Sequence, residues 1–165
     1  MVFRKSKSDE KEEAIEQIIC KRYDNFYRMA YSYVHDEADA FDIVQEGACR
    51  AIQRSDSLKD VSYAATWVYR IMLNETFRFL EKKKKETYDE LESIEYGRVD
   101  EYENIDLKRA LDEMEPKDKA VIQLKYFEEY TLSEIAQILE ENTSTVKSRL
   151  YRGLKKLRIK LEDEE

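Results

Sequence analysis

Apolar residues recur at steps of three and four along most of this chain, a spacing that places them on one face of an α-helix. The first stripe comprises Tyr23, Phe26, Tyr27, Ala30, Tyr31 and Val34. Asp36 follows as the expected N-cap, and the second stripe comprises Ala38, Phe41, Val44, Ala48 and Ile52. A third helix is predicted over residues 62–83, with Ala64, Val68, Ile71, Met72 and Phe79 facing inward. We predict that these three helices enclose one small core.

The stretch over residues 86–104 has no sustained apolar period. After Glu86 it contains the acids Asp89, Glu90, Glu92, Glu95, Asp100, Glu101 and Glu103, with Arg98 as the single base. A high density of like charges without an apolar face to pack favours a linker over a fourth core helix. The predicted organisation is a polar N-terminal segment with the start of the first helix over 1–20, a helical domain over 21–85, the acidic linker over 86–104 and a second domain over 105–165.

The second domain is predicted to end in a helix-turn-helix over residues 131–160. A short helix precedes it over 107–114, and Pro116 suits the first position of another. Thr131 and Glu134 have the spacing of a capping box, and the buried stripe after them is Leu132, Ile135, Ala136 and Leu139. A break at 140–142 leads to a longer helix with the inner stripe Val146, Leu150, Leu154, Leu157 and Leu161. Two helices joined so tightly must cross, and the small Ala136 permits a close approach.

Composition supports an all-helical protein of two small domains. Of 165 residues, 40% are charged and only 3 are Gly and 1 is Pro, so the turn formers of a many-stranded sheet are missing. No apolar run approaches a membrane span and the N-terminus is polar, which predicts a cytoplasmic protein. Cys20 and Cys49 stand apart from any CxxC or Cys/His cluster, so we expect buried or neutral thiols and neither metal nor cofactor.

The formal net charge of −8 argues against a nucleic-acid partner until the charge is followed along the chain. Residues 144–161 contain seven bases and no acid: Lys147, Arg149, Arg152, Lys155, Lys156, Arg158 and Lys160. Helical geometry is expected to turn Thr145, Lys147, Ser148, Arg149, Arg152 and Lys156 away from the apolar stripe. Such a face suits a major groove, and Arg149 is the leading candidate to bond a base edge. The alternative is a merely solvated basic helix.

Two polar stripes on the first domain suggest further contacts. Along the third predicted helix, Tyr63, Trp67, Arg70, Asn74, Arg78 and Lys82 interleave aromatic and basic side chains. Such a surface can stack unpaired bases and follow a phosphate backbone, although a lone Trp at this spacing also fits a core position. On the preceding helix, Asp42, Gln45 and Glu46 form an acidic strip. The strip either binds a basic partner, or it is an ordinary solvated face that is stabilised by an ion pair between Glu46 and Arg50.

Several segments resemble the extracytoplasmic-function (ECF) sigma factors, and the likeness covers most of the chain after about residue 21. Residues 114–119, 121–126, 131–136 and 145–152 resemble sigma domain four without gaps. Residues 42–46 resemble the segment of domain two that docks on the clamp helices of RNA polymerase, and residues 65–71 with Asn74 resemble its minus-ten segment. The chain departs from the family at the turn. Glu140 and Glu141 replace the usual Gly and apolar residue, and Ser144 replaces Gly. The sequence around this turn is most similar to the sigma-V subgroup.

The resemblance implies a dissociable polymerase subunit. The C-terminal motif would recognise the minus-thirty-five duplex, the first domain would hold the opened minus-ten strand, and a membrane-anchored anti-sigma factor would cover both. No small-molecule substrate is implied. One rival is a conventional helix-turn-helix regulator, which would bind duplex DNA alone, usually as a dimer. A helical enzyme is disfavoured, because His35 is the only histidine and no catalytic set or phosphate loop accompanies it.

Overall fold

The computed structural model describes residues 4–89 and 105–163, and all regular elements within these residues are helical. This confirms the all-helical prediction. The chain divides into two compact units, 1–81 and 82–165, each described here by itself. Most of the predicted acidic linker lies outside the described residues. Its first residues, 86–89, continue the last helix of the N-terminal stretch.

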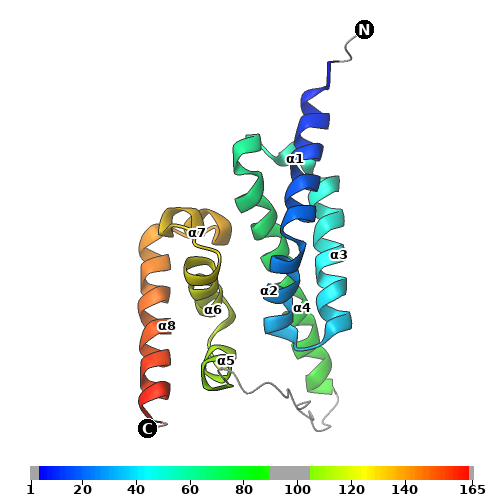
Figure 1. The fold of residues 1–165 in the computed structure, drawn as a ribbon. Coiled ribbons are helices and arrows are strands. Elements are labelled where there is room, and N and C mark those ends of the chain that lie inside the picture. The colour runs from blue at the N-terminus through cyan, green and yellow to red at the C-terminus, as the bar shows by residue number, and fades with distance from the viewer. Residues whose placement is uncertain (1–3, 90–104, 164–165) are drawn as a thin grey trace. The chain divides into compact units, whose positions relative to one another are not determined.

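The first unit contains the helices α1 (Lys7–Lys21), α2 (Tyr23–Val34) and α3 (Glu37–Gln53) and most of α4 (Ala64–Asp89), whose residues from 82 onward fall in the second unit. Two short 3₁₀ turns lie at Ser55–Ser57 and Val61–Tyr63 (Figure 1). The apolar pattern did not separate α1, because Ile15 is its only fully buried side chain. Its start is nevertheless encoded locally, since Ser6 and Asp9 form a capping box. His35 ends α2 in a left-handed conformation, as expected of a helix-boundary residue.

The core of this unit forms where α2 and α4 bring large side chains together. Phe26 and Tyr69 meet edge to face with ring centroids 4.6 Å apart, and both are fully buried. The predicted inward residues Ala64, Val68, Ile71 and Met72 are buried, and Asp36 caps α3 by accepting a hydrogen bond from the N–H of Asp39 (2.9 Å). The third predicted helix and the N-cap of the second are therefore confirmed, although Phe79, also predicted to face inward, is only half-buried.

The inward face predicted for α3 is wrong, because most of the buried residues lie one position before the predicted ones. The buried set is Ala40, Ile43, Val44, Gly47 and Ala51. Of the predicted stripe, Val44 alone is buried, and Phe41 is 49% exposed. Small residues line this face because the helices approach closely: a methyl group added at Gly47 would lie 2.5 Å from the sulfur of Met72.

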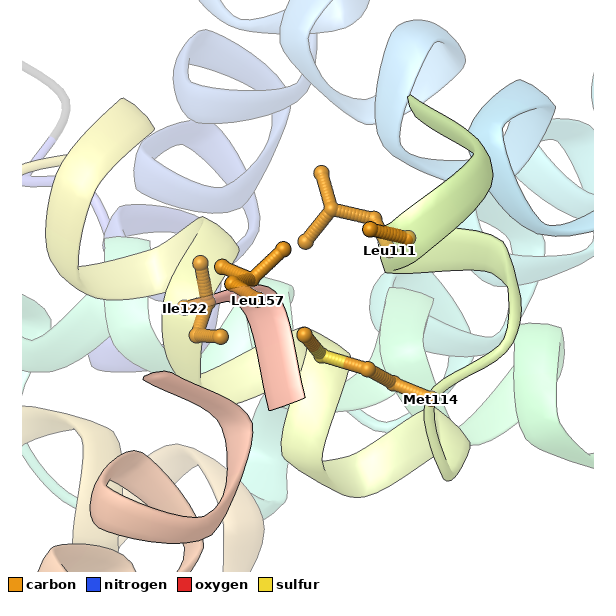
Figure 2. Close-up of a cluster of buried hydrophobic side chains, with 5 residues drawn as sticks. Leu111, Met114, Ile122 and Leu157 are labelled. Carbon is orange, nitrogen blue, oxygen red and sulfur yellow. The ribbon is translucent and has the colours of Figure 1, made fainter. Parts of the chain in front are cut away.

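The second unit contains α5 (Ile105–Asp112), α6 (Pro116–Ile122), a single π-turn at Gln123–Phe127, α7 (Leu132–Leu139) and α8 (Thr143–Asp163). Pro116 occupies the first turn of α6, as predicted. Figure 2 shows Leu111, Met114, Ile122 and Leu157 converging in a cluster that joins α5, α6 and α8. This cluster holds the long C-terminal helix against the two helices that precede the helix-turn-helix.

The inner face of α8 differs from the predicted stripe at one position. Val146 and Leu157 are buried and Leu150 is half-buried, but Leu154 is 37% exposed. Gly153 takes its place on the buried face, where an added methyl group would lie 2.7 Å from Cδ1 of Ile122. Leu161 lies outside the described side chains.

Candidate nucleic-acid interface

The helix-turn-helix forms as predicted, because polar side chains cap both of its helices. Oγ1 of Thr131 accepts a hydrogen bond from the N–H of Glu134 (3.2 Å), and the Thr131 hydroxyl donates to the carboxylate of Glu134 (3.0 Å). Glu140 ends α7 in the left-handed region at φ 54°. At the start of α8, Oδ1 of Asn142 accepts from the N–H of Thr145 (2.8 Å). The turn is thus set by residues adjacent in sequence.

The exposed face of α8 carries bases and hydroxyls. Its exposed side chains include Lys147, Ser148, Tyr151, Arg152, Lys155, Lys156 and Arg158. Ser148 donates to the carbonyl of Ser144 (3.1 Å), and the Thr145 hydroxyl donates to Asn142 (2.8 Å), so both hydroxyls have local partners. Tyr151 was not singled out from sequence, yet it is 76% exposed in the middle of this face. A cationic surface with one protruding aromatic ring suits contact with duplex DNA.

The predicted outward placement of Arg149 is wrong. Its side chain is only 13% exposed and lies against acids from α6 and from the turn. Nε and Nη2 donate to the two carboxylate oxygens of Glu141 at 2.7 and 2.9 Å, and Nη1 donates to Asp118 at 3.0 Å. Glu115 lies at 3.4 Å from Nη1. Arg149 is thus the centre of an internal ion-pair network.

These contacts are charge-assisted and partly buried, which makes them stronger than surface ion pairs. Hydrogen bonds from Arg149 lower the pKa of the Glu141 carboxyl, and Lys117 lowers it further. Glu141 is one of the residues by which the chain departs from the family pattern, and it makes the two-point contact with Arg149. Two features of the sequence could have indicated this network, namely the departure from the family pattern at Glu141 and the acid two residues after Pro116.

The aromatic-basic stripe of α4 is present on the surface except for one member. Tyr63 is 54% exposed, Asn74, Arg78 and Lys82 are also exposed, and Arg70 is half-buried. Trp67 is only 9% exposed, so the core alternative that the sequence left open for this residue is the correct one. Its neighbours Val68 and Tyr69 are fully buried too, because this part of α4 is surrounded by other helices of the unit.

The acidic strip of α3 is accessible. Asp42, Gln45 and Glu46 are exposed, and the carboxylate of Glu46 lies 3.4 Å from Nε of Arg50, as the sequence indicated. Both cysteines are exposed, so the first alternative of the expectation that they are buried or neutral thiols is wrong. Among the described residues, no group of His, Cys, Asp and Glu side chains is arranged to hold a metal ion. None of the described helices has the length and apolar character needed to span a membrane.

Known proteins resemble the chain along both units. The family model described as Sigma-70 region 2 matches residues 20–86, and that described as Sigma-70, region 4 matches residues 105–157. The RNA polymerase sigma factor SigV of Bacillus subtilis (strain 168) is 42% identical over 144 residues, which cover 86% of this chain and 87% of that protein. The ECF RNA polymerase sigma factor SigW of the same organism is 30% identical, covering 92% and 91%.

Two solved structures share the fold. The sigma factor RpoE from Bartonella quintana, crystallised with the anti-sigma factor NepR, has a TM-score of 0.71 at 23% identity, covering 91% of this chain and 98% of that one. CnrH, in complex with the cytosolic domain of CnrY, has a TM-score of 0.67 at 21% identity, covering 92% and 89%. The arrangement of helices is therefore one that known sigma factors adopt.

Proposed function

Because this chain belongs to the ECF group of the sigma-70 family, we propose that each of its two units recognises one element of a promoter. It binds core RNA polymerase and directs promoter-specific initiation of transcription, as the members of this family do. The rival interpretation, a conventional helix-turn-helix regulator, is set aside because the relatives match the N-terminal unit as well as the motif.

The second unit recognises the minus-thirty-five duplex through the exposed face of α8. The observation that carries this assignment is a capped helix-turn-helix whose second helix has bases and hydroxyls on its solvent side. We assign the contacts to Thr145, Lys147, Ser148, Arg152 and Lys156. Arg149 leaves this set, because its guanidinium is already bound to Glu141 and Asp118. Arg152 takes over as the arginine available for a base edge.

The first unit holds the opened minus-ten strand along α4. Tyr63 offers an exposed ring for stacking, and the cations Arg70, Arg78 and Lys82 follow the backbone, with Asn74 among them. Trp67 stabilises the helix from within the core instead of contacting bases. Strand opening would be driven by binding the flipped bases and their backbone, without nucleotide hydrolysis.

The acidic strip of α3 seats the chain on core polymerase. Asp42 and Glu46 are like charges four residues apart on an exposed helix, which is unfavourable in isolation and favourable against a basic partner. Gln45 lies between them and supplies a neutral hydrogen-bonding group. We assign this surface to the clamp helices of the polymerase β-prime subunit.

Regulation by sequestration completes the proposal. A membrane-anchored anti-sigma factor would cover these surfaces at the inner face of the membrane until a signal releases the chain into the cytoplasm. One solved neighbour, RpoE, was crystallised with an anti-sigma factor, NepR, and the other, CnrH, is in complex with the cytosolic domain of CnrY. Co-purification of the tagged chain from membranes before induction, and from the soluble fraction after it, would support this regulation. Recovery from the soluble fraction in both states would contradict it.

Run-off transcription with purified core RNA polymerase on a promoter library tests the function directly. Addition of the chain should produce transcripts from a defined subset of promoters. Replacement of Arg152 by Ala should weaken one minus-thirty-five position by about 1–3 kcal/mol, whereas Lys155→Ala should weaken all sequences alike. The proposal fails if no promoter-specific transcript appears while the chain alone shifts duplex DNA tightly.

A further inference from the structure

Asp118, on α6, points both oxygens of a fully buried carboxylate toward α8, the helix that α6 packs against (Figure 1). Oδ1 accepts a hydrogen bond from Nη1 of Arg149 at 3.0 Å. Oδ2 lies 3.1 Å from Nε of Arg152, close enough for an ion pair, although it accepts no hydrogen bond. A carboxylate at 0% exposure requires cationic partners, because burying a charge without them is costly. One acid of α6 therefore fixes two arginines that lie one helical turn apart on α8.

The two arginines are in different positions with respect to solvent. The side chain of Arg149 is 13% exposed and shares its donors among Asp118, Glu141 and Glu115. That of Arg152 is 51% exposed, and its ion pair with Asp118 is made through Nε. A guanidinium is planar and presents donors on more than one edge. With Nε held, the edge formed by the two Nη atoms of Arg152 remains available for a ligand.

We propose that Asp118 is a positioning residue for promoter recognition: it holds Arg152 in place to meet a base edge, while Arg149 compensates the buried charge. This inference rests on the proposed function of α8 in recognising the minus-thirty-five duplex. An arginine that contacts a guanine uses two parallel donors, so its orientation decides whether both bonds form. A side chain already ordered by Asp118 loses less conformational freedom when DNA binds.

The network also accounts for Glu141 at the turn. Without Glu141, Arg149 would be held by Asp118 and Glu115 alone. The two-point contact with Glu141 keeps Arg149 directed at α6. Arg149 therefore acts on recognition through the position of α8, and Arg152 through direct contact.

The test uses the full chain assembled with core polymerase, on a promoter recovered from the transcription library. Apparent affinity is measured for that promoter and for versions with each minus-thirty-five base pair replaced, and the ratio of the two gives selectivity at each position. The variants are Asp118→Asn, Arg152→Ala and their combination. Glu141→Gln, alone and with Arg152→Ala, is the matched control, because it removes a charge from the network without touching the contact between Asp118 and Arg152.

Arg152→Ala should lower selectivity at one base pair by about tenfold. Asp118→Asn should lower it at the same base pair by about two- to tenfold, the range for ordering one long side chain on binding. In the double variant, Asp118→Asn should add nothing to the effect of Arg152→Ala. Glu141→Gln should leave selectivity at this base pair unchanged, although it lowers the melting temperature.

Two results would overturn the inference. One is unchanged selectivity in folded Asp118→Asn, and the other is an equal loss whether or not Arg152 is present, which would mark a purely structural role. Since Asp118→Asn risks misfolding, the wild-type chain provides a second measurement by NMR. In nitrogen-15 relaxation, the Nε of Arg152 should be more ordered than that of the exposed Arg54, and equal mobility would also refute the proposal. Absence of any promoter selectivity in the wild type would instead overturn the proposed function itself.

Discussion

Replacement of Arg149 by Ala is expected to destabilise the second unit, not to remove a DNA contact. The substitution leaves the fully buried carboxylate of Asp118 and the largely buried carboxylate of Glu141 without their main partner. Removing one member of a buried ion pair costs about 3–5 kcal/mol. Part of this loss is recovered, because Arg152 still lies 3.1 Å from Asp118 and Lys117 lies 3.4 Å from Glu141. We therefore expect the free energy of unfolding of this unit to fall by about 2–3 kcal/mol.

Amide hydrogen exchange of the full chain measures this loss by unit, which matters because the two units need not unfold together. Protection of the amides in α6 and α8 should fall by the amount given above, while protection in α2 and α3 stays unchanged. Lys156→Ala, which shortens an exposed side chain on the same helix, is the matched control and should stay within about 0.5 kcal/mol of wild type.

The difference between wild type and Arg149→Ala should depend on pH. Folding lowers the pKa of Glu141 from its ordinary value of 4.5, so the stability that this carboxylate contributes is present above pH 4.5 and is lost as the pH falls through the folded value. The variant lacks most of that contribution, so the difference in stability should narrow as the pH falls below 4.5 and through the folded pKa of Glu141. An unchanged stability at neutral pH, with loss of preference at one promoter base pair, would refute this reasoning and return Arg149 to the DNA-contacting set.

Three further predictions concern Gly153, Glu140 and the pair Trp67 and Tyr63, and the stability of each variant is measured by urea unfolding monitored by circular dichroism. Gly153→Ala should cost about 1–3 kcal/mol, because the new methyl group would lie 2.7 Å from Ile122; full stability would contradict the close approach, and Ile122→Val should restore part of the loss. Glu140→Gly should stabilise by about 0.5–1 kcal/mol by relieving a φ of 54°, and destabilisation would show that the side chain matters more than the backbone. Trp67→Ala should lower the free energy of unfolding by about 3–5 kcal/mol. Tyr63→Ala should leave stability within about 0.5 kcal/mol and reduce promoter opening. A stable Trp67→Ala that opens promoters poorly, with a destabilised Tyr63→Ala, would contradict these roles.

Local signals in the sequence predicted the helix-turn-helix well. The caps at Asp36 and Thr131 and the proline at the start of α6 act within a few residues of where they stand, so no knowledge of distant contacts was needed. The burial of Trp67 depends instead on which helices surround α4. A residue in a stripe beside the apolar stripe can lie on the surface or in the core. Which of the two places it takes depends on how the other helices of the unit pack around it.

The two misplaced faces have one physical cause, which is a glycine at a close contact between helices. On α3 the apolar pattern includes Phe41 and Ala48, whereas Gly47 is the buried residue. On α8 the pattern includes Leu154, whereas Gly153 is buried. Because a helix has 3.6 residues per turn, choosing the residue next to the glycine in place of the glycine turns the inferred face by about 100° at that position.

On α8 this shift explains the error about Arg149. With Leu154 in the stripe, Arg149 lies about 100° from the middle of the apolar face. With Gly153 in its place the angle falls to about 80°, and Arg149 lies beside the stripe, three residues after Val146 and four before Gly153. The absence of a side chain at Gly153 lets α6 approach, and the same approach brings Asp118 within 3.0 Å of the guanidinium. The close contact and the ion pair are therefore one feature, and an apolar pattern that assigns no weight to glycine predicts neither. If so, Gly153→Ala should loosen the hold of Asp118 on Arg149 and Arg152, and lower promoter selectivity together with stability.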